Sequence, residues 1–221
     1  MSKKLPKVIT VANVLNQSVS LIDLKSIDTA LYQAFGNVQK RGVWFIYGGS
    51  GSGKSSLALA IARALCLSAD LKGIINELEE ELDDLDFINR IKLYKMQDVK
   101  FFSAGYDYEQ LNEYLDRRNS PEVVIINSAS YFFKKVEQYL EFTRKYKRKK
   151  ILIITGHAKG NNPYSELEVK IKYDANKKIF CYGYLANCQG RTIGPNGGNY
   201  VIWQEGYEKV RGTEIKEETK K

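Results

Sequence analysis

A glycine-rich segment between two apolar runs constrains this chain most strongly. Residues 43–56 read Val-Trp-Phe-Ile-Tyr-Gly-Gly-Ser-Gly-Ser-Gly-Lys-Ser-Ser and match the phosphate-binding pattern GxxxxGK[ST]. The apolar residues before the glycines predict a buried strand, and the Leu- and Ala-rich residues 55–65 predict a helix. A flexible linker that contained Lys-Ser by chance would have neither neighbour. The segment therefore predicts the strand, loop and helix of a nucleotide-binding α/β domain.

The residue types in this loop suit the binding of phosphate groups. Glycine lets the backbone curl until several N–H groups point at one anion. Lys54 places a flexible cation against the outer phosphates, and the Ser55 hydroxyl is a hard oxygen ligand suited to Mg²⁺. The helix that follows directs its positive end to the same place. The predicted binding residues for ATP are Gly48, Gly49, Ser50, Gly51, Ser52, Gly53, Lys54, Ser55 and Ser56.

Length and composition indicate one globular domain. The 221 residues can bury a substantial core, and a hydrophobic content of 43% is ordinary. No apolar stretch approaches the length that spans a bilayer, and the basic N-terminus lacks the apolar run of a secretion signal. Cys66, Cys181 and Cys188 lack metal-ligand spacing, and an odd number suits a reducing cytosol. We therefore expect a cytoplasmic protein with no membrane partner, in which Cys66 is a core thiol.

The charge balance allows a polyanionic partner. The formal net charge is +8, from 34 basic and 26 acidic residues. A basic run covers residues 144–150, and an acidic run covers residues 77–86. The basic run ends a predicted helix, where cations interact favourably with the helix dipole. It is therefore either a solvated helix end or a contact for DNA.

Short apolar runs alternate with helical segments over the central part of the chain. This alternation predicts a mostly parallel sheet covered by helices on both faces. The predicted strands are Val43–Tyr47, Gly73–Asn76, Val99–Phe102, Val123–Ile126 and Ile151–Thr155. The predicted helices are Ser55–Cys66, Asp84–Lys95, Tyr108–Arg117 and Phe132–Tyr146.

The two ends of the chain have a different pattern. Glu168–Tyr173, Lys178–Tyr184 and Tyr200–Trp203 predict antiparallel strands joined by turns. Leucine and isoleucine recur at helical spacing between Leu21 and Leu31, which predicts a packing helix before the core. We expect an N-terminal packing segment over residues 1–40, an ATPase core over 41–212 and a polar, fraying tail over 213–221.

Hydrolysis of a bound nucleotide needs an acidic residue to organise Mg²⁺. The apolar run Val123–Ile126 has the form of the strand that carries it, but the polar residue that follows is Asn127, where Asp is expected. An amide oxygen still accepts a hydrogen bond from metal-bound water, yet it brings no negative charge. Asn127 is therefore a candidate metal residue with Ser55, or the capping residue of a buried strand.

Hydrolysis also needs a base that orients water, and a carboxylate at a strand end is the expected source. The strand from Gly73 runs into a segment with several carboxylates, among which we favour Glu79 over Glu80. His157 follows the last core strand, where open sheets bind ligands. It is either a sensor of the γ-phosphate or a structural histidine.

The order of these segments resembles the core of the RecA-type ATPases. The strand–GGSGSGKSS–helix unit, INELEE, VVIINS and ILIITGHAKG follow each other as they do in the RadA and DnaB-helicase branch. The segment GRTIGPNGG is similar to a C-terminal stretch of P-loop ATPases that bacteriophages and bacterial mobile elements encode. The resemblance covers roughly residues 40–205.

This resemblance implies a RecA-like P-loop NTPase core with a mostly parallel central sheet and antiparallel C-terminal strands. It implies binding of ATP and Mg²⁺, and action on DNA, single-stranded DNA above all, in recombination, repair or replication. Lys54 and Ser55 match the phosphate and magnesium residues, Glu79 the water-orienting residue, and His157 the sensor. Arg191 lies near the basic residue that reaches a neighbouring subunit in ring- or filament-forming relatives, or it is a surface arginine beside a glycine turn.

Three functions remain open from the sequence. The first is a DNA-stimulated ATPase that assembles into a homo-oligomer, in the bacterial host cytoplasm if a phage encodes it. The second is a nucleotide-binding assembly or regulatory protein with weak or no hydrolysis, because Asn127 replaces the usual Asp. The third is a phosphotransferase, which the lack of a compact arginine-bearing lid disfavours.

Overall fold

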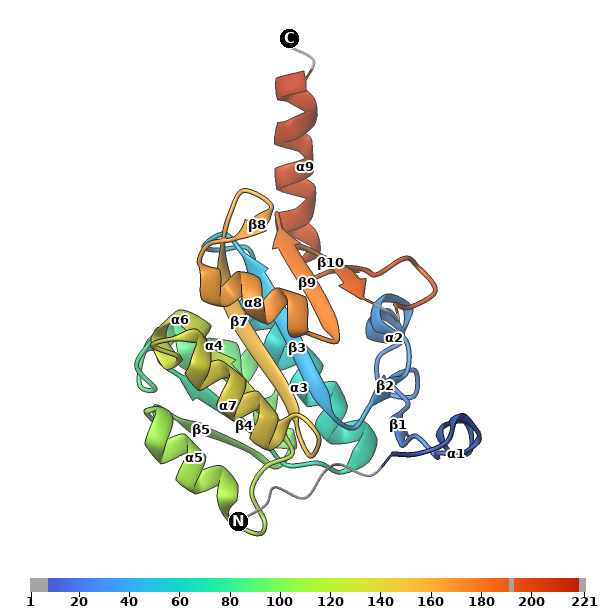
Figure 1. Cartoon of the computed structure of the whole chain (residues 1–221). Helices are drawn as coiled ribbons and strands as arrows, with labels where there is room; N and C mark the ends of the chain where they lie inside the picture. The colour runs from blue at the N-terminus through green and yellow to red at the C-terminus, as the bar shows by residue number, and fades with distance from the viewer. Residues whose placement is uncertain (1–7, 191–192, 219–221) are drawn as a thin grey trace.

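A twisted sheet with helices on both faces forms the body of the computed structural model, which describes residues 8–190 and 193–218 (Figure 1). The strand order is β11-β10-β9-β3-β7-β6-β4-β5, and β8 pairs with β7. The six strands from β9 to β5 in this order run parallel, whereas β10, β11 and β8 pair antiparallel. The expected mostly parallel sheet with antiparallel C-terminal strands is therefore confirmed.

The strands of this sheet take their bounds from short apolar runs. They are β3 (Gly42–Gly48), β4 (Gly73–Glu77), β5 (Phe101–Ala104), β6 (Val123–Asn127), β7 (Ile151–Lys159), β8 (Asn162–Pro163), β9 (Lys177–Tyr182), β10 (Leu185–Gly190) and β11 (Asn199–Val201). A separate ribbon pairs β1 (Leu21–Ile22) with β2 (Val38–Gln39). Every residue of β3, β4 and β6 is buried, as expected for central parallel strands covered on both faces.

The helices divide between the two faces. They are α1 (Val11–Leu15), α2 (Thr29–Phe35), α3 (Lys54–Ala69), α4 (Leu85–Leu93), α5 (Tyr108–Asp116), α6 (Ala129–Phe132), α7 (Val136–Tyr146), α8 (Glu166–Asp174) and α9 (Gln204–Glu218), with a 3₁₀ turn at Met96–Asp98. In Figure 1, α7 and α8 lie in front of the sheet and α3 lies behind it, while α9 extends away from the body.

Alternate residues of the strands feed two hydrophobic cores. Trp44 and Ile46 of β3 join the core that contains α2, α3 and Phe87 of α4. Phe45 and Tyr47 point the other way, into the core that contains α5, α6, α7 and α8. This period of two matches the pleat of a strand, and it explains why the central strands are apolar throughout.

The predicted strand Glu168–Tyr173 is wrong, because these residues lie in helix α8. Alternation of Lys170, Ile171 and Lys172 suggested a strand, but Ser165 begins a helix there. The Ser165 hydroxyl accepts a hydrogen bond from the Glu168 backbone N–H, and the Glu168 carboxylate accepts one from the Ser165 backbone N–H. This capping box satisfies two donors of the first helical turn, and local capping outweighs the apparent alternation.

Other boundaries differ from the prediction. The N-terminal helix does not start near Leu21, which lies in β1; α2 begins after Asp28, whose side chain caps it by accepting from the Leu31 N–H. The predicted helix Phe132–Tyr146 is divided into α6 and α7. The sequence also did not separate β10 from β9: Gly183 and Tyr184 form the two-residue turn between them, both with positive φ.

The division into an N-terminal packing segment, a core and a tail stays a prediction. The backbone of α9 runs through position 213 to Glu218, so the expected polar tail starts within a helix. Within the described residues, no helix has both the length and the apolar character that crossing a bilayer requires.

Candidate nucleotide-binding site

The glycine-rich loop joins β3 to α3 at the carboxyl edge of the parallel strands. Gly51 and Gly53 have positive φ angles of 68° and 92°, which favour glycine. At Gly48, a Cβ atom would lie 2.3 Å from the Cys181 carbonyl oxygen of β9, so glycine is required for close approach. The loop therefore lies at the sheet edge where open α/β folds bind ligands, with glycine at positions that its backbone requires.

Lys54 is the first residue of α3 and lies back against the loop. Its Nζ atom donates to the Gly49 carbonyl oxygen at 2.7 Å, and Ser52 Oγ donates to the same oxygen at 2.8 Å. Burial lowers the pKa of the Lys54 ammonium, because a low-dielectric environment disfavours the charged form. A buried ammonium beside a loop of backbone N–H groups fits a phosphate anion.

Asn127 lies at the carboxyl end of β6, within reach of Ser55. Ser55 Oγ donates to Asn127 Oδ1 at 3.3 Å, and Thr155 Oγ1 donates to the same oxygen at 2.6 Å. Hydroxyl and amide oxygens are hard donors that suit Mg²⁺. The structure therefore brings together the two residues predicted for the metal, and their donor atoms fit that ion. Across the described part of the chain, no cluster of three or more His, Cys, Asp or Glu side chains offers another metal site.

Glu77 is the residue that sequence reasoning missed. It pairs with Asn127 in the register of β4 and β6, and Asn127 Nδ2 donates to its two carboxylate oxygens at 2.7 and 2.8 Å. The backbone N–H of Glu79 donates to Glu77 Oε1 at 3.0 Å. Glu77 is only 2% exposed, and this burial raises the pKa of its carboxyl group. In the sequence, Glu77 continues the strand that precedes the more exposed acidic residues. This position was the signal that could have identified it.

Glu79 and Glu80 have different surroundings. Glu79 Oε1 lies 3.1 Å from His157 Nε2, and the two side chains are 23% and 37% exposed. Glu80 instead pairs with Arg90 of α4. Glu79 thus faces the strand end that carries His157, whereas Glu80 is held toward a helix at the side. The role of Glu79 as the water-orienting residue stays a prediction that this geometry favours.

Glu168 fixes the backbone that carries His157. Glu168 Oε1 accepts from the His157 backbone N–H at 2.7 Å, and the side chain is fully buried. Its second oxygen accepts from the Ser165 N–H and hydroxyl. Helix α8 is therefore tied directly to the strand end at which His157 contacts Glu79.

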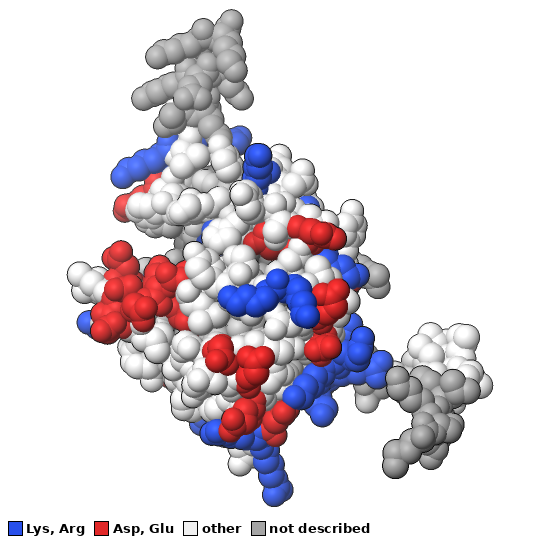
Figure 2. Space-filling view, turned by 60° about the vertical axis from the view of Figure 1, so that its left-hand side comes forward, with Lys and Arg blue, Asp and Glu red and all other residues white. Residues whose placement is uncertain are grey.

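Other predicted residues lie elsewhere. Arg191 falls outside the described residues. The basic run contributes to the fold in part: Lys145 pairs with Asp116 at 2.6 Å, and the Lys150 ammonium is buried and donates to Ser120 Oγ and the Pro121 carbonyl oxygen, both at 2.8 Å. On the face in Figure 2, acidic side chains form one dense patch at the left, while elsewhere acidic and basic side chains lie next to each other. Cys66, Cys181 and Cys188 are buried free thiols, so the expectation for Cys66 is confirmed.

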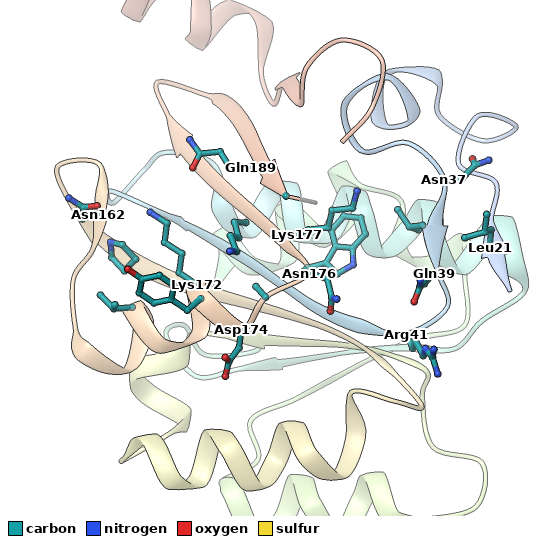
Figure 3. A pocket seen from close by; sticks show the side chains of 18 residues that line it. Leu21, Asn37, Gln39, Arg41, Asn162, Lys172, Asp174, Asn176, Lys177 and Gln189 are labelled. Carbon is teal, nitrogen blue, oxygen red and sulfur yellow. The ribbon is translucent and has the colours of Figure 1, made fainter. Parts of the chain in front are cut away.

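A cavity of about 840 Å³ lies away from the glycine-rich loop. It opens beside Arg41 and Trp44, at the start of β3, and beside Lys177 and Lys178, at the start of β9 (Figure 3). Lys172 of α8 also lines it, and its ammonium lies 4.7 Å from the centre of the Tyr47 ring. Because the loop follows the opposite end of β3, this basic cavity is a feature separate from the predicted phosphate site.

Comparison with known proteins identifies the fold. No family model and no curated protein matches the sequence. Among solved structures, the flagellar accessory protein FlaH from Methanocaldococcus jannaschii is similar, with a TM-score of 0.57 and 19% sequence identity. The match covers 83% of this chain and 92% of that one. Together with the strand order and the loop position, this similarity gives the chain a RecA-like α/β fold.

Proposed function

We propose that this protein binds ATP with Mg²⁺ and hydrolyses it. One observation carries the proposal: the glycine-rich loop, Lys54 and the Ser55–Asn127 contact meet at the carboxyl edge of a RecA-like sheet. This edge is where open α/β sheets bind ligands. The buried Lys54 ammonium, held against the loop by the Gly49 carbonyl oxygen, supports phosphate binding at that place.

The residues at this edge have distinct roles in the proposed reaction. The loop N–H groups and Lys54 bind the phosphates, and Ser55 and Asn127 hold Mg²⁺. When bound, Mg²⁺ neutralises charge that develops on the phosphate oxygens. Glu79 accepts a hydrogen bond from the attacking water and orients it, and the contact with His157 fixes the Glu79 carboxylate.

The proposed partner is DNA, with single-stranded DNA favoured. The net charge of +8 supports a polyanion, and Arg41, Lys172 and Lys178 give the cavity a basic lining. The same proposal includes assembly into a ring or filament, a relation to the RadA and DnaB branch, and an origin in phages or mobile elements. They rest on the order of motifs in the sequence.

An ATPase assay with and without single-stranded DNA tests this function. Wild type is expected to release phosphate faster when DNA is present, and Lys54→Ala is expected to abolish turnover. Lys92→Ala, which removes an exposed lysine of α4, is the matched control and should leave the rate unchanged. Hydrolysis in wild type that no form of DNA stimulates would refute action on DNA.

A second candidate is a nucleotide-dependent assembly protein that hydrolyses slowly or not at all. The observation that favours it is that Ser55 contacts the uncharged Asn127 where an acidic residue is usual. Light scattering with ATP and with a nonhydrolysable analogue tests this candidate. Equal assembly with both nucleotides, and recovery of ATP unchanged, would support it; assembly that follows brisk hydrolysis would exclude it.

A further inference from the structure

The chain from Ser55 through Asn127 to Glu77 indicates how this site manages without an acidic residue at position 127. We propose that Glu77 is a positioning residue that supplies the missing negative charge one step away, through the Asn127 carboxamide. The inference rests on the proposed Mg²⁺–ATP function and goes beyond it, because it assigns a role to Glu77 that the motifs do not suggest.

The hydrogen bonds define which way the amide faces. A carboxamide has one accepting oxygen and one donating nitrogen, whereas an ionised carboxylate only accepts. The Glu77 carboxylate therefore requires the nitrogen of Asn127 on its side, and both of its oxygens lie within 2.8 Å of Nδ2. The Asn127 oxygen is then directed to the hydroxyl groups of Ser55 and Thr155. By holding the amide nitrogen, Glu77 thus turns the hard Oδ1 oxygen of Asn127 toward the position proposed for the metal.

The burial of Glu77 gives an independent argument. Buried carboxylates are normally paired with a cation or help to hold a metal. Of the ion pairs in the described part of the chain, none includes Glu77, although the residue is 2% exposed. Among the described residues, the hydrogen bonds to its carboxylate come from the Glu79 backbone N–H and the Asn127 amide. A divalent cation held beyond Asn127 would balance this charge.

This arrangement predicts that aspartate is disfavoured at position 127. The substitution Asn127→Asp would put a second carboxylate in direct contact with that of Glu77 and would remove the hydrogen-bond donor between them. Like charges at this separation repel strongly in a buried site. The combination Glu77→Gln with Asn127→Asp keeps one negative charge, now at position 127. The amide introduced at position 77 can then donate to the carboxylate introduced at position 127, so the donor and the acceptor exchange positions.

The test measures ATP affinity with Mg²⁺ and with EDTA, by calorimetry, for wild type, Glu77→Gln, Asn127→Asp and the double variant. In the wild-type background, Glu77→Gln should lower the ATP affinity measured with Mg²⁺ by roughly 10- to 100-fold, as for other residues that orient a metal ligand. In the Asn127→Asp background the same change should raise it. Binding of ATP in EDTA should change little. If Glu77 had only a structural role, its loss would weaken ATP binding with and without Mg²⁺. Glu80→Gln is the matched control.

Urea unfolding of the four ligand-free proteins is the second readout. Asn127→Asp should be less stable than wild type, and adding Glu77→Gln should recover much of the loss. A Glu77→Gln effect of the same sign in both backgrounds, or none in either, would overturn the inference. If no variant binds ATP but the unfolding pattern appears, the pairing of the two residues stands and the proposed function fails. Because Glu77→Gln keeps size and shape, it remains informative even if Asn127→Asp does not fold.

Discussion

His157 Nε2 lies 3.1 Å from Glu79 Oε1, which joins the ends of two strands that are not neighbours in the sheet. β7 carries His157, Glu79 follows β4, and β6 lies between these strands. The contact therefore spans the end of β6, where Asn127 meets Glu77 and Ser55. In the proposed reaction, a change on one side of the site can reach Glu79, the carboxylate proposed to orient water, through this contact.

Glu79→Gln is expected to lower the rate of ATP hydrolysis while ATP binding persists. The amide keeps the shape of the side chain but cannot act as a base, and loss of a general base typically costs roughly 10²- to 10⁴-fold in rate. Steady-state phosphate release with a parallel binding titration measures both effects. Glu80→Gln breaks the pair with Arg90 and should leave hydrolysis near wild type. A larger loss for Glu80→Gln than for Glu79→Gln would assign the role to the other residue.

His157→Ala should weaken hydrolysis without removing nucleotide affinity. It leaves Glu79 without the imidazole that holds it, so the expected loss is smaller than that of Glu79→Gln. The backbone N–H of residue 157 still donates to Glu168, and the strand end should keep its position. The same assay checks the order of the two effects. Identical rates for His157→Ala and wild type would make this histidine a purely structural or solvent-facing residue.

Glu168→Ala is expected to destabilise the protein by about 2–4 kcal/mol. It removes the acceptor for the partly buried His157 N–H and one half of the capping box of α8. Such losses cost about 1–3 kcal/mol for an unsatisfied donor and about 1 kcal/mol for a cap. Urea unfolding measures the change. Glu166→Ala, at an exposed site in the same helical turn, serves as the control and should have little effect.

The buried thiols predict a loss of stability at alkaline pH. Burial raises the pKa of Cys66 from 9.0 to about 12, so the folded thiol keeps a proton that the unfolded thiol releases. The folded state then binds more protons above pH 9, and the free energy of unfolding falls as pH rises. Between pH 8 and pH 10 one such thiol costs about 1.4 kcal/mol.

Cys66→Ala isolates this contribution from the buried lysines, whose lowered pKa values act in the opposite direction. Urea unfolding of wild type and Cys66→Ala at pH 8 and pH 10 gives four free energies. The variant should be less stable overall, since it leaves a cavity, but it should lose about 1.4 kcal/mol less between the two pH values. An equal pH dependence in both proteins would show that Cys66 titrates alike folded and unfolded.

The central fold was predictable because its signals are local and agree with each other. The apolar runs that became β3, β4, β6 and β7 are continuous, as buried parallel strands require, and the glycine-rich loop fixes where the first of them ends. Helix α8 was missed because its alternating pattern was weighed without the Ser165–Glu168 capping box. That signal is present in the sequence.

The site was less predictable, because it depends on the register between distant strands. The sequence shows Glu77, Glu79 and Glu80 within one acidic segment, and only the place of Glu77 at the end of the strand sets it apart. The pairing of Glu77 with Asn127, fifty positions later, buries one of them and leaves Glu79 to meet His157. Such selection arises from the arrangement of strands, which a single sequence does not display.

Isothermal titration of the folded protein with ATP and Mg²⁺ tests the central claim most directly. The account predicts saturable heat from binding of one nucleotide per chain, which Lys54→Ala abolishes or strongly reduces and Lys92→Ala preserves. Absence of heat from ATP and from a nonhydrolysable analogue in the wild-type protein, with folding verified by circular dichroism, would contradict it.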